Sequence, residues 1–362
     1  MPAGYLVEAG LMAAVVASAV VRRLPRRSSP FRPSFVFGLF LNWPLAVVLA
    51  LVVSTALAIA QNGVASPVFW IGLGFAVVAS AGLAVLRRRA AGTGPALERA
   101  LDEGLGTGWR DGVEADLAAR LRRRPSLARV LLAPISFRRL GVERIANIRY
   151  GPARRANLLD VYRNRTGRSG RPILIYLHGG AFRFGSKRFG ARHLLYRLAS
   201  HGWVCISANY RLRSSGPADP LTDVRNVIAW ARERAGEHGA DPNAVFVAGS
   251  SAGANLALRT ALDDNGTTVA GVISPYGYYG SVASDRRTTD APPSFVVHGD
   301  SDTLVVVDDA RRFVEQLRVT STNPVVYAEL PGAQHGFDLF RSRRFETVVD
   351  AVEAFALAGA GR

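Results

Sequence analysis

A serine, an aspartate and a histidine that could together perform nucleophilic catalysis follow one another in the second half of the chain. The serine is Ser251, at the centre of Gly-Ser-Ser-Ala-Gly at residues 249–253. A serine hydroxyl is a poor nucleophile near neutral pH, so it needs a base to accept its proton, and the base needs an acid to orient it. Only His298 and His335 follow Ser251 among the histidines, so these two are the candidate bases.

We predict that His335 is the base. It lies in a glycine-flanked loop at residues 332–337, between an expected strand and the last expected helix, from which it could reach across the sheet edge. His298 closes an expected strand and is interpreted as a structural residue that bonds within its own turn. Asp302 follows that strand by a few residues and is the predicted acid, in the order serine, acid, histidine. Asp300 is an alternative acid that the sequence leaves open.

The same reaction needs hydrogen-bond donors for the negative oxygen that develops during attack. His178-Gly179-Gly180-Ala181 follows an expected strand and resembles the His-Gly-Gly-Gly motif of esterases and lipases, with Ala181 at the last glycine. Glycine lets the backbone approach a substrate closely. We therefore predict an oxyanion hole formed by the backbone N–H groups of Gly179, Gly180 and Ala252.

The elements that must position these residues alternate between strands and helices from about Val142 onward. An apolar run at residues 244–248 precedes the serine, and a run of helix formers at 254–262 follows it, as a nucleophile elbow requires. The alternation predicts an α/β fold with a mainly parallel central sheet and helices on both faces. The expected strands are 145–150, 157–162, 173–177, 203–208, 244–248, 269–273, 295–297 and 325–329, and the expected helices are 192–200, 221–235, 254–262, 304–319 and 344–357.

At these motifs the chain resembles the α/β-hydrolase fold, in the hormone-sensitive-lipase-like branch of carboxylesterases and lipases. The resemblance covers roughly 60% of the chain, from about residue 145 to 360. It implies that Ser251, Asp302 and His335 are the nucleophile, acid and base of a serine esterase. The stretches that carry it are 178–182, 209–212, 223–230, 249–253, 298–302 and 335–337.

Two positions depart from the pattern of this branch. Ser250 stands before the nucleophile where the branch often has Asp, and Arg213 follows Tyr-Arg-Leu where the branch usually continues Ala-Pro-Glu. These departures concern the subfamily and substrate rather than the catalytic residues. Some membrane-anchored members act on prenylcysteine methyl esters or lipid esters, which the resemblance brings into consideration here.

Composition excludes several other kinds of site. The 362 residues carry a formal net charge of +17, and Lys187 is the only lysine. No basic patch with interleaved aromatic residues is present, so nucleic-acid binding is not expected. Cys205 is the only cysteine and lies in an apolar run, so neither an internal disulfide nor a cysteine-rich metal cluster is expected. We expect no metal and no cofactor.

The basic excess has a better explanation in the first ninety residues. Three apolar stretches, 5–21, 35–60 and 67–86, approach or exceed the length of about 20 residues that a membrane span needs. Arginines at 22, 23, 26, 27 and 32 separate the first two, and Arg87, Arg88 and Arg89 follow the third. By the positive-inside rule both clusters are cytoplasmic. We therefore predict a multi-pass membrane protein with an external N-terminus and a cytoplasmic catalytic domain. If the first stretch is instead interfacial, a two-span hairpin remains.

The predicted organisation has three parts. Residues 1–89 form the membrane region, 90–140 a basic helical linker or cap, and 141–362 the catalytic domain. Within the second part, residues 90–95 are expected to be a flexible connector. The basic segment after it could lie on anionic lipid, pack on the catalytic domain or cover the active site as a lid.

The function predicted from these features is a membrane-anchored serine carboxylesterase or lipase that hydrolyses an apolar or lipid-derived ester through an acyl-enzyme. An amidase or peptidase on the same fold is one alternative, and a non-catalytic membrane-tethered binding domain is another. Acyl length and oligomeric state are not predicted.

Overall fold

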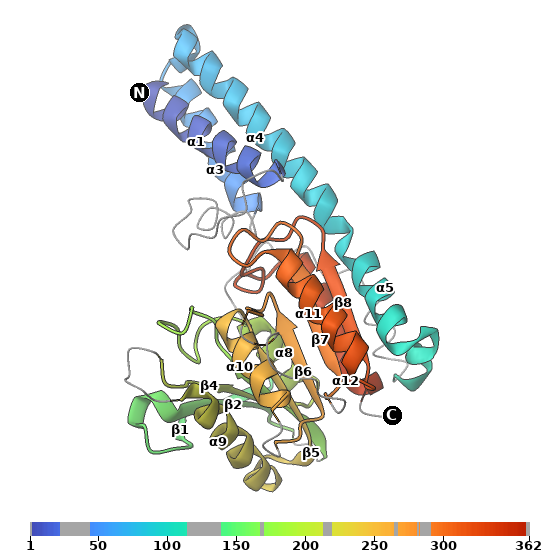
Figure 1. Cartoon of the computed structure of the whole chain (residues 1–362). Coiled ribbons are helices and arrows are strands. Elements are labelled where there is room, and N and C mark those ends of the chain that lie inside the picture. The colour runs from blue at the N-terminus through green and yellow to red at the C-terminus, as the bar shows by residue number, and fades with distance from the viewer. Residues whose placement is uncertain are drawn as a thin grey trace.

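The computed structural model describes residues 2–21, 44–113, 139–166, 170–212, 219–263, 267–280, 282 and 291–359. It consists of an eight-stranded sheet covered by helices and a helical bundle that projects from it (Figure 1). The predicted arginine loop at 22–32, the start of the second apolar stretch at 35–43, the basic segment at 114–138 and Arg213 all lie outside the described residues.

The sheet has the strand order β1-β2-β4-β3-β5-β6-β7-β8. The pairs β1–β2 and β2–β4 are antiparallel and every other pair is parallel, so the expected mainly parallel sheet carries an antiparallel hairpin at one edge. The strands are β1 (Val142–Arg149), β2 (Leu158–Asn164), β3 (Arg171–Leu177), β4 (Val204–Ala208), β5 (Ala240–Gly249), β6 (Gly271–Pro275), β7 (Ser294–Gly299) and β8 (Val325–Leu330).

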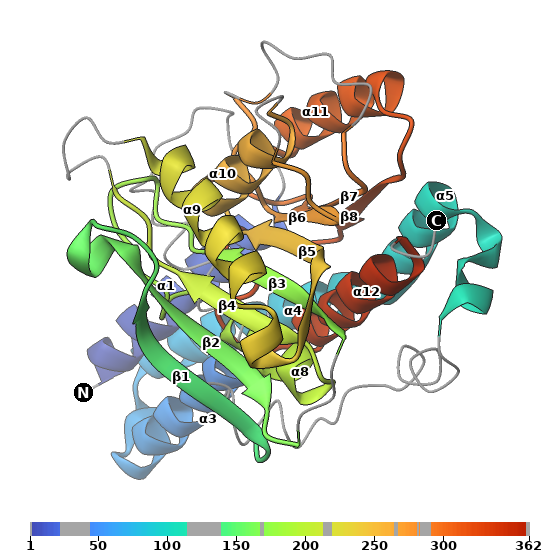
Figure 2. The same cartoon turned by 90° about the horizontal axis from the view of Figure 1, so that it is seen from below.

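Helices cover both faces of this sheet, which is why its central strands are apolar on both sides. In β3, for example, Leu174 and Tyr176 belong to one core and Ile173 and Ile175 to the other. Helices α8 (Arg192–Ser200) and α12 (Arg343–Gly359) lie on one face, and α9 (Pro220–Glu233), α10 (Ala252–Ala261) and α11 (Val307–Thr320) lie on the opposite face, as Figure 2 shows.

The expected flexible connector at residues 90–95 is wrong, because the chain is helical there. Helix α4 (Pro67–Ala91) is followed at once by α5 (Thr93–Leu105). The residue between them, Gly92, has right-handed helical angles, with φ −73° and ψ −5°. Pro95 falls in the first turn of α5, where a missing N–H removes no helical hydrogen bond.

Helix α5 fixes this long rod to the catalytic domain. Leu97, Leu101 and Leu105 lie in the core shared with β8 and α12. Gly104 allows the close approach, since a Cβ atom at this position would lie 2.6 Å from a methyl carbon of Val326. The helix that leaves the bundle is therefore the same helix that packs on the sheet.

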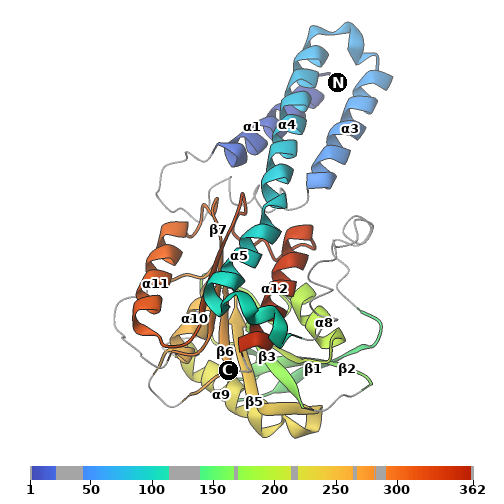
Figure 3. The same cartoon turned by 90° about the vertical axis from the view of Figure 1, so that its right-hand side faces the viewer.

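The bundle contains α1 (Pro2–Val20), α3 (Pro44–Ala60) and α4, as Figure 3 shows. Helices α1 and α4 approach closely through small residues, with Gly82 of α4 beside Val16 of α1. Arg89 Nη1 donates to the carbonyl oxygen of Val20 at 3.0 Å, so the end of α1 lies beside the end of α4. The N-terminus is then at the far end of the bundle (Figure 1).

Two helical segments of the described chain, Ala3–Val20 and Pro67–Leu105, are long and apolar enough to cross a membrane, and Val47–Ala60 is shorter. Length and composition alone also fit a buried core helix or a signal sequence. The outer surface of the bundle adds a further observation. Among described residues, 15 of the 20 exposed large apolar side chains belong to positions 7–85, including Val7 at 69% and Val77 at 61% exposure.

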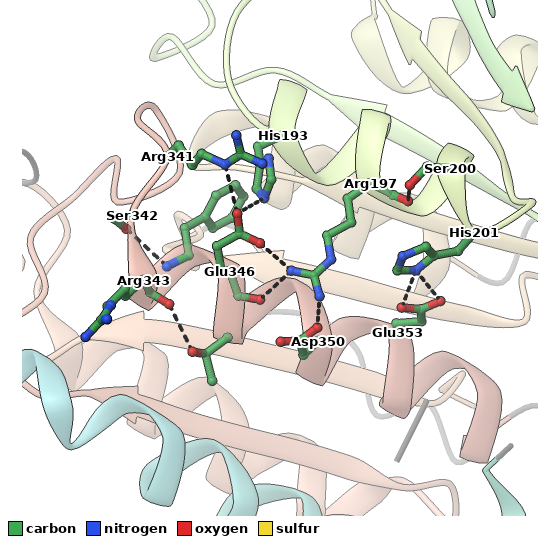
Figure 4. A network of polar contacts seen from close by, with 12 residues as sticks. His193, Arg197, Ser200, His201, Arg341, Ser342, Arg343, Glu346, Asp350 and Glu353 are labelled. Carbon is green, nitrogen blue, oxygen red and sulfur yellow. Dashed lines mark hydrogen bonds and ion pairs between the residues drawn. The ribbon is translucent and has the colours of Figure 1, made fainter. Parts of the chain in front are cut away.

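A buried network of charges joins α8 to α12 (Figure 4). The Arg197 guanidinium pairs with the carboxylates of Glu346 and Asp350. Arg341 Nε donates to Glu346 at 2.9 Å, and His193 Nε2 lies 3.0 Å from the same carboxylate. Burial opposes ionisation of Glu346, but its hydrogen bond with His193 and the surrounding positive charges hold its pKa below the ordinary value.

We expect Arg197→Met to lower the free energy of unfolding of the catalytic domain by about 3 kcal/mol, because two buried carboxylates each lose a positively charged partner. Urea unfolding followed by tryptophan fluorescence measures the change. Arg312→Met is the matched control, since Arg312 pairs with Asp309 on an exposed helix face and should cost less than about 1 kcal/mol. Equal losses in both variants would show that the network contributes no more than a surface pair.

Candidate active site

Ser251 occupies a sharp turn between β5 and α10. Its backbone angles, φ 53° and ψ −115°, are strained for a residue with a side chain. The flanking glycines are required by close contacts. A Cβ atom on Gly249 would lie 2.4 Å from the backbone of Gly253, and one on Gly253 would lie 2.1 Å from the carbonyl oxygen of Leu177. This is the geometry of a nucleophile elbow, which presents the hydroxyl at the carboxyl edge of the sheet.

The structure brings Ser251, His335 and Asp302 into one chain of hydrogen bonds. His335 Nε2 lies 3.0 Å from Ser251 Oγ, and His335 Nδ1 lies 2.7 Å from Asp302 Oδ2. The other carboxylate oxygen of Asp302 accepts from the N–H groups of Leu304 and Val305 at 2.8 and 2.9 Å. Both oxygens of Asp302 therefore have donors, and the carboxylate is held in place.

The electrostatics of Asp302 favour a charged carboxylate. Burial alone would raise its pKa, but the charges and hydrogen bonds of His335 and His298 bring the pKa of Asp302 below its ordinary value. Asp302 is then ionised at neutral pH, facing the Nδ1–H of His335.

The two residues that the sequence offered as alternatives have other contacts. Asp300 Oδ1 accepts from the N–H of Gly332 at 2.7 Å, which ties the loop after β7 to the loop that carries His335. His298 is fully buried, and its Nε2 lies 2.9 Å from the carbonyl oxygen of Val305. The same nitrogen is 3.3 Å from Asp302, a contact the sequence did not suggest.

The loop after β3 places glycine backbone directly beside the nucleophile. A Cβ atom on Gly179 would lie 3.3 Å from that of Ser251, and Gly180 has φ +127°, which only glycine adopts readily. His178 stacks on Tyr210 with ring centroids 4.4 Å apart, and its Nδ1 is 2.7 Å from the carbonyl oxygen of Gly179. Burial lowers the pKa of His178 to about 4, so at neutral pH an uncharged imidazole donates this bond. Ala252, the third predicted donor, is the first residue of α10.

Comparison with known proteins assigns the chain to a family. A model of the BD-FAE family matches residues 159–286. The probable carboxylic ester hydrolase LipM of Mycobacterium tuberculosis is 35% identical, with 77% of this chain and 76% of the relative covered. Esterase LipQ of the same organism is 32% identical, with 72% and 73% covered.

The chain belongs to the α/β-hydrolase carboxylesterases, the family of LipM and LipQ. As a member it is a serine hydrolase that acts on esters. Among solved structures, the butyrate-bound esterase 2 of Thermogutta terrifontis aligns with a TM-score of 0.48 at 21% identity, over 56% of this chain and 87% of that one.

The esterase also contains a buried carboxylate beneath the site that sequence reasoning missed. Asp338 accepts hydrogen bonds from the hydroxyl groups of Tyr276 and Tyr176 and from the N–H of Ala191. Tyr176 lies 2.7 Å from Ser250 Oγ, and the Tyr276 ring packs edge-on against His335 at 4.6 Å. Burial raises the pKa of Asp338 although three donors oppose the shift.

The signal for this group was its position three residues after His335, on the same loop. Tyr176 belongs to β3 and Tyr276 follows β6 directly, and no pattern in the sequence links them to Asp338. Asp338 thus connects the residue before the nucleophile with the ring that supports the histidine.

We expect Asp302→Asn to reduce the turnover of the esterase on a water-soluble short-chain ester by about 10³- to 10⁴-fold. The amide would no longer balance the charge of a protonated His335. Asp300→Asn, which keeps an acceptor for Gly332 N–H, should reduce turnover less than tenfold, by the same reasoning. Thermal unfolding of both variants checks that they are folded. Equal losses, or a larger loss in Asp300→Asn, would assign the acid to Asp300.

Proposed function

We propose that the esterase cleaves carboxylic esters through an acyl-enzyme formed on Ser251. The observation that carries the proposal is the continuous contact from Ser251 Oγ through His335 to Asp302, at 3.0 and 2.7 Å. Ser251 Oγ attacks the ester carbonyl carbon while its proton passes to His335 Nε2. Asp302 stabilises the imidazolium that forms and does not itself take the proton.

The negative oxygen of the tetrahedral intermediate needs donors that are already in position. In this proposal the N–H groups of Gly179, Gly180 and Ala252 supply them. Gly179 packs against Ser251, and Ala252 directly follows Ser251 in the chain. Both positions support the assignment of their N–H groups to the oxyanion hole. The neutral His178, bonded to the carbonyl oxygen of Gly179, helps to hold this backbone in place.

Collapse of the intermediate expels the alcohol, which takes its proton from His335 Nε2. A water molecule then attacks the acyl group, with His335 as the base, and the second tetrahedral intermediate releases the carboxylic acid and free Ser251. Each proton leaves and returns through one imidazole, so no cofactor is required by these steps.

We expect Ser251→Ala to reduce ester turnover by about a millionfold and to abolish covalent labelling by a fluorophosphonate. Ser250→Ala is the neighbouring control. It removes the contact with Tyr176 but keeps the nucleophile, so it should still be labelled. Loss of labelling in Ser250→Ala but not in Ser251→Ala would place the nucleophile one residue earlier. Matched ester and amide substrates, tested with the unmodified chain, separate esterase from amidase activity.

We propose further that the bundle anchors the esterase in a membrane, with the catalytic domain on the cytoplasmic side. The apolar length of α1 and α4 and the apolar side chains on the outside of the bundle support this. Arg87, Arg88 and Arg89 lie at the end of α4 that meets the catalytic domain, where the positive-inside rule expects them. An ester that partitions into the bilayer is then the natural substrate class.

We expect protease added to intact cells to leave the catalytic domain uncut, and the same protease to digest it once the membrane is permeabilised. Alkaline carbonate should leave the chain in the membrane pellet, because apolar helices and not surface charges hold it there. Digestion of the catalytic domain in intact cells would contradict the proposed orientation. Release of the chain by carbonate would contradict the proposal that the bundle is a membrane anchor.

A further inference from the structure

Two exposed aromatic residues outside the bundle adjoin the active site. The exposed large apolar side chains outside the bundle, among described residues, are Leu140, Phe184, Phe189, Tyr278 and Val319, and Phe184 and Tyr278 are the two that contact residues of the site. The Phe184 ring lies over Gly180, where a Cβ atom would be 3.2 Å from it. Tyr278 N–H donates to the carbonyl oxygen of Ser251 at 3.2 Å. Exposed aromatic residues thus adjoin both the glycine loop after β3 and the backbone of the nucleophile.

Two of these rings belong to one loop with a repeated pattern. Residues 181–190 contain Arg183-Phe184 and Arg188-Phe189, and all four side chains are exposed. Neither arginine forms an ion pair with any other residue in the described ranges. Lys187 of the same loop behaves differently, because it is buried and pairs with Asp160. The lysine holds the loop to the domain and leaves the two arginine–phenylalanine pairs outside.

One end of this loop lies beside the nucleophile and the other is bonded to Asp338 beneath the site. It begins beside Gly179, which packs on Ser251, and it ends at Ala191, whose N–H donates to Asp338 at 3.2 Å. The exposed rings are therefore held at the site by contacts on either side and are not on a distant surface.

The carboxyl edge of the parallel strands, where Ser251 lies, is the edge nearest the bundle. The parallel strands end at one edge of the sheet, so the loops after β3, β5, β7 and β8 gather there. The loop after β8 also touches the end of α4, with a Cβ atom on Gly332 expected 3.1 Å from that of Arg89, and Pro331 beside Gly92. Figure 1 shows the bundle standing at this end of the catalytic domain.

We propose that residues 181–190 and Tyr278 rest in the interface of the membrane that holds the bundle, and pass bilayer-dissolved esters directly to Ser251. We call this surface the aromatic rim. Aromatic rings favour the headgroup region, and arginines there are attracted to anionic lipid. The inference rests on the proposed anchoring and on the proposed chemistry of Ser251.

The rim sets the substrate class more narrowly than the fold does. The ester bond of an amphiphile lies near the headgroup boundary, with its acyl chains below it. Phe184 of the rim contacts Gly180, and the neighbouring Gly179 contacts Ser251, so the rim lies close to the nucleophile. Long-chain esters held in a lipid leaflet therefore need little displacement to reach the nucleophile, while short soluble esters gain nothing from the rim.

Contact with lipid can be measured without an activity assay. Cys205 is the only cysteine and is fully buried, so a thiol introduced by Phe184→Cys can be labelled selectively with an environment-sensitive fluorophore. The full chain is reconstituted in vesicles of phosphatidylcholine and phosphatidylglycerol at about 4:1, a composition chosen to give an anionic surface. We expect spin-labelled lipid to quench the label at position 184.

The matched control is Val319→Cys, at the far end of α11 and 83% exposed, which should not be quenched. Equal quenching, or no quenching, at the two positions would overturn the aromatic rim.

Activity gives a second test. In Phe184→Ser/Phe189→Ser and in Arg183→Gln/Arg188→Gln, hydrolysis of a long-chain ester in these vesicles should fall at least about tenfold further than hydrolysis of a soluble acetate ester. Val319→Ser should leave both rates unchanged. A parallel loss of the two rates would overturn the rim.

The outcomes separate this inference from those beneath it. Absence of soluble-ester hydrolysis in the unmodified chain would refute the proposed chemistry, and failure of the chain to remain in vesicles would refute the anchor. With both of those intact, an unchanged ratio of the two rates overturns the rim alone.

Discussion

The close approach of α10 to β3 and β5 is the constraint on which the site depends. Gly249 and Gly253 have no room for a side chain, so strand and helix meet across a single strained residue, Ser251. A relaxed turn would need more residues and would carry the hydroxyl away from the sheet edge. The cost of a positive φ, roughly 1–3 kcal/mol, is offset by the packed helix and strand on either side. The position of His335 is useful for catalysis only because the Ser251 hydroxyl is fixed within hydrogen-bonding distance of it.

Two buried carboxylates stabilise the surroundings of His335 from different sides. Asp302 bonds the ring directly, and Asp338 acts through Tyr276, whose edge packs on the imidazole. The two environments shift the pKa of their carboxylates in opposite directions. Contacts with His335 and His298 lower the pKa of Asp302, whereas burial raises that of Asp338. Asp302 is suited to balance an imidazolium, and Asp338 fixes the neighbouring tyrosine rings, one of which contacts Ser250.

The pattern of apolar residues and the positions of strand ends predicted most of the fold and of the catalytic residues from the sequence. Buried parallel strands are apolar on both faces, which made β3 to β8 recognisable, and catalytic candidates could be selected because they follow such strands. The antiparallel pairing of β2 with β4 depends on register, which no local pattern encodes. The contact of His298 with Asp302 depends on the path of the turn after β7. Asp338 was missed because its partners come from β3, from the end of β6 and from the start of α8. The connector at 90–95 was misinterpreted because glycine and proline are both acceptable in a helix at the positions where they occur.

Because α4 continues directly into α5, the rotation of the catalytic domain about the helix axis is fixed relative to the bundle. A flexible tether would let the catalytic domain turn freely above the bilayer, but a helix transmits rotation about its own axis. One residue inserted near Gly92 would turn the domain by about 100° and move it by about 1.5 Å relative to the bundle, if the helix stayed intact. Insertions that approach whole helical turns would restore its facing. The orientation of the active site relative to the bundle is therefore set by the number of residues between Arg89 and Leu97, as well as by the surface of the domain.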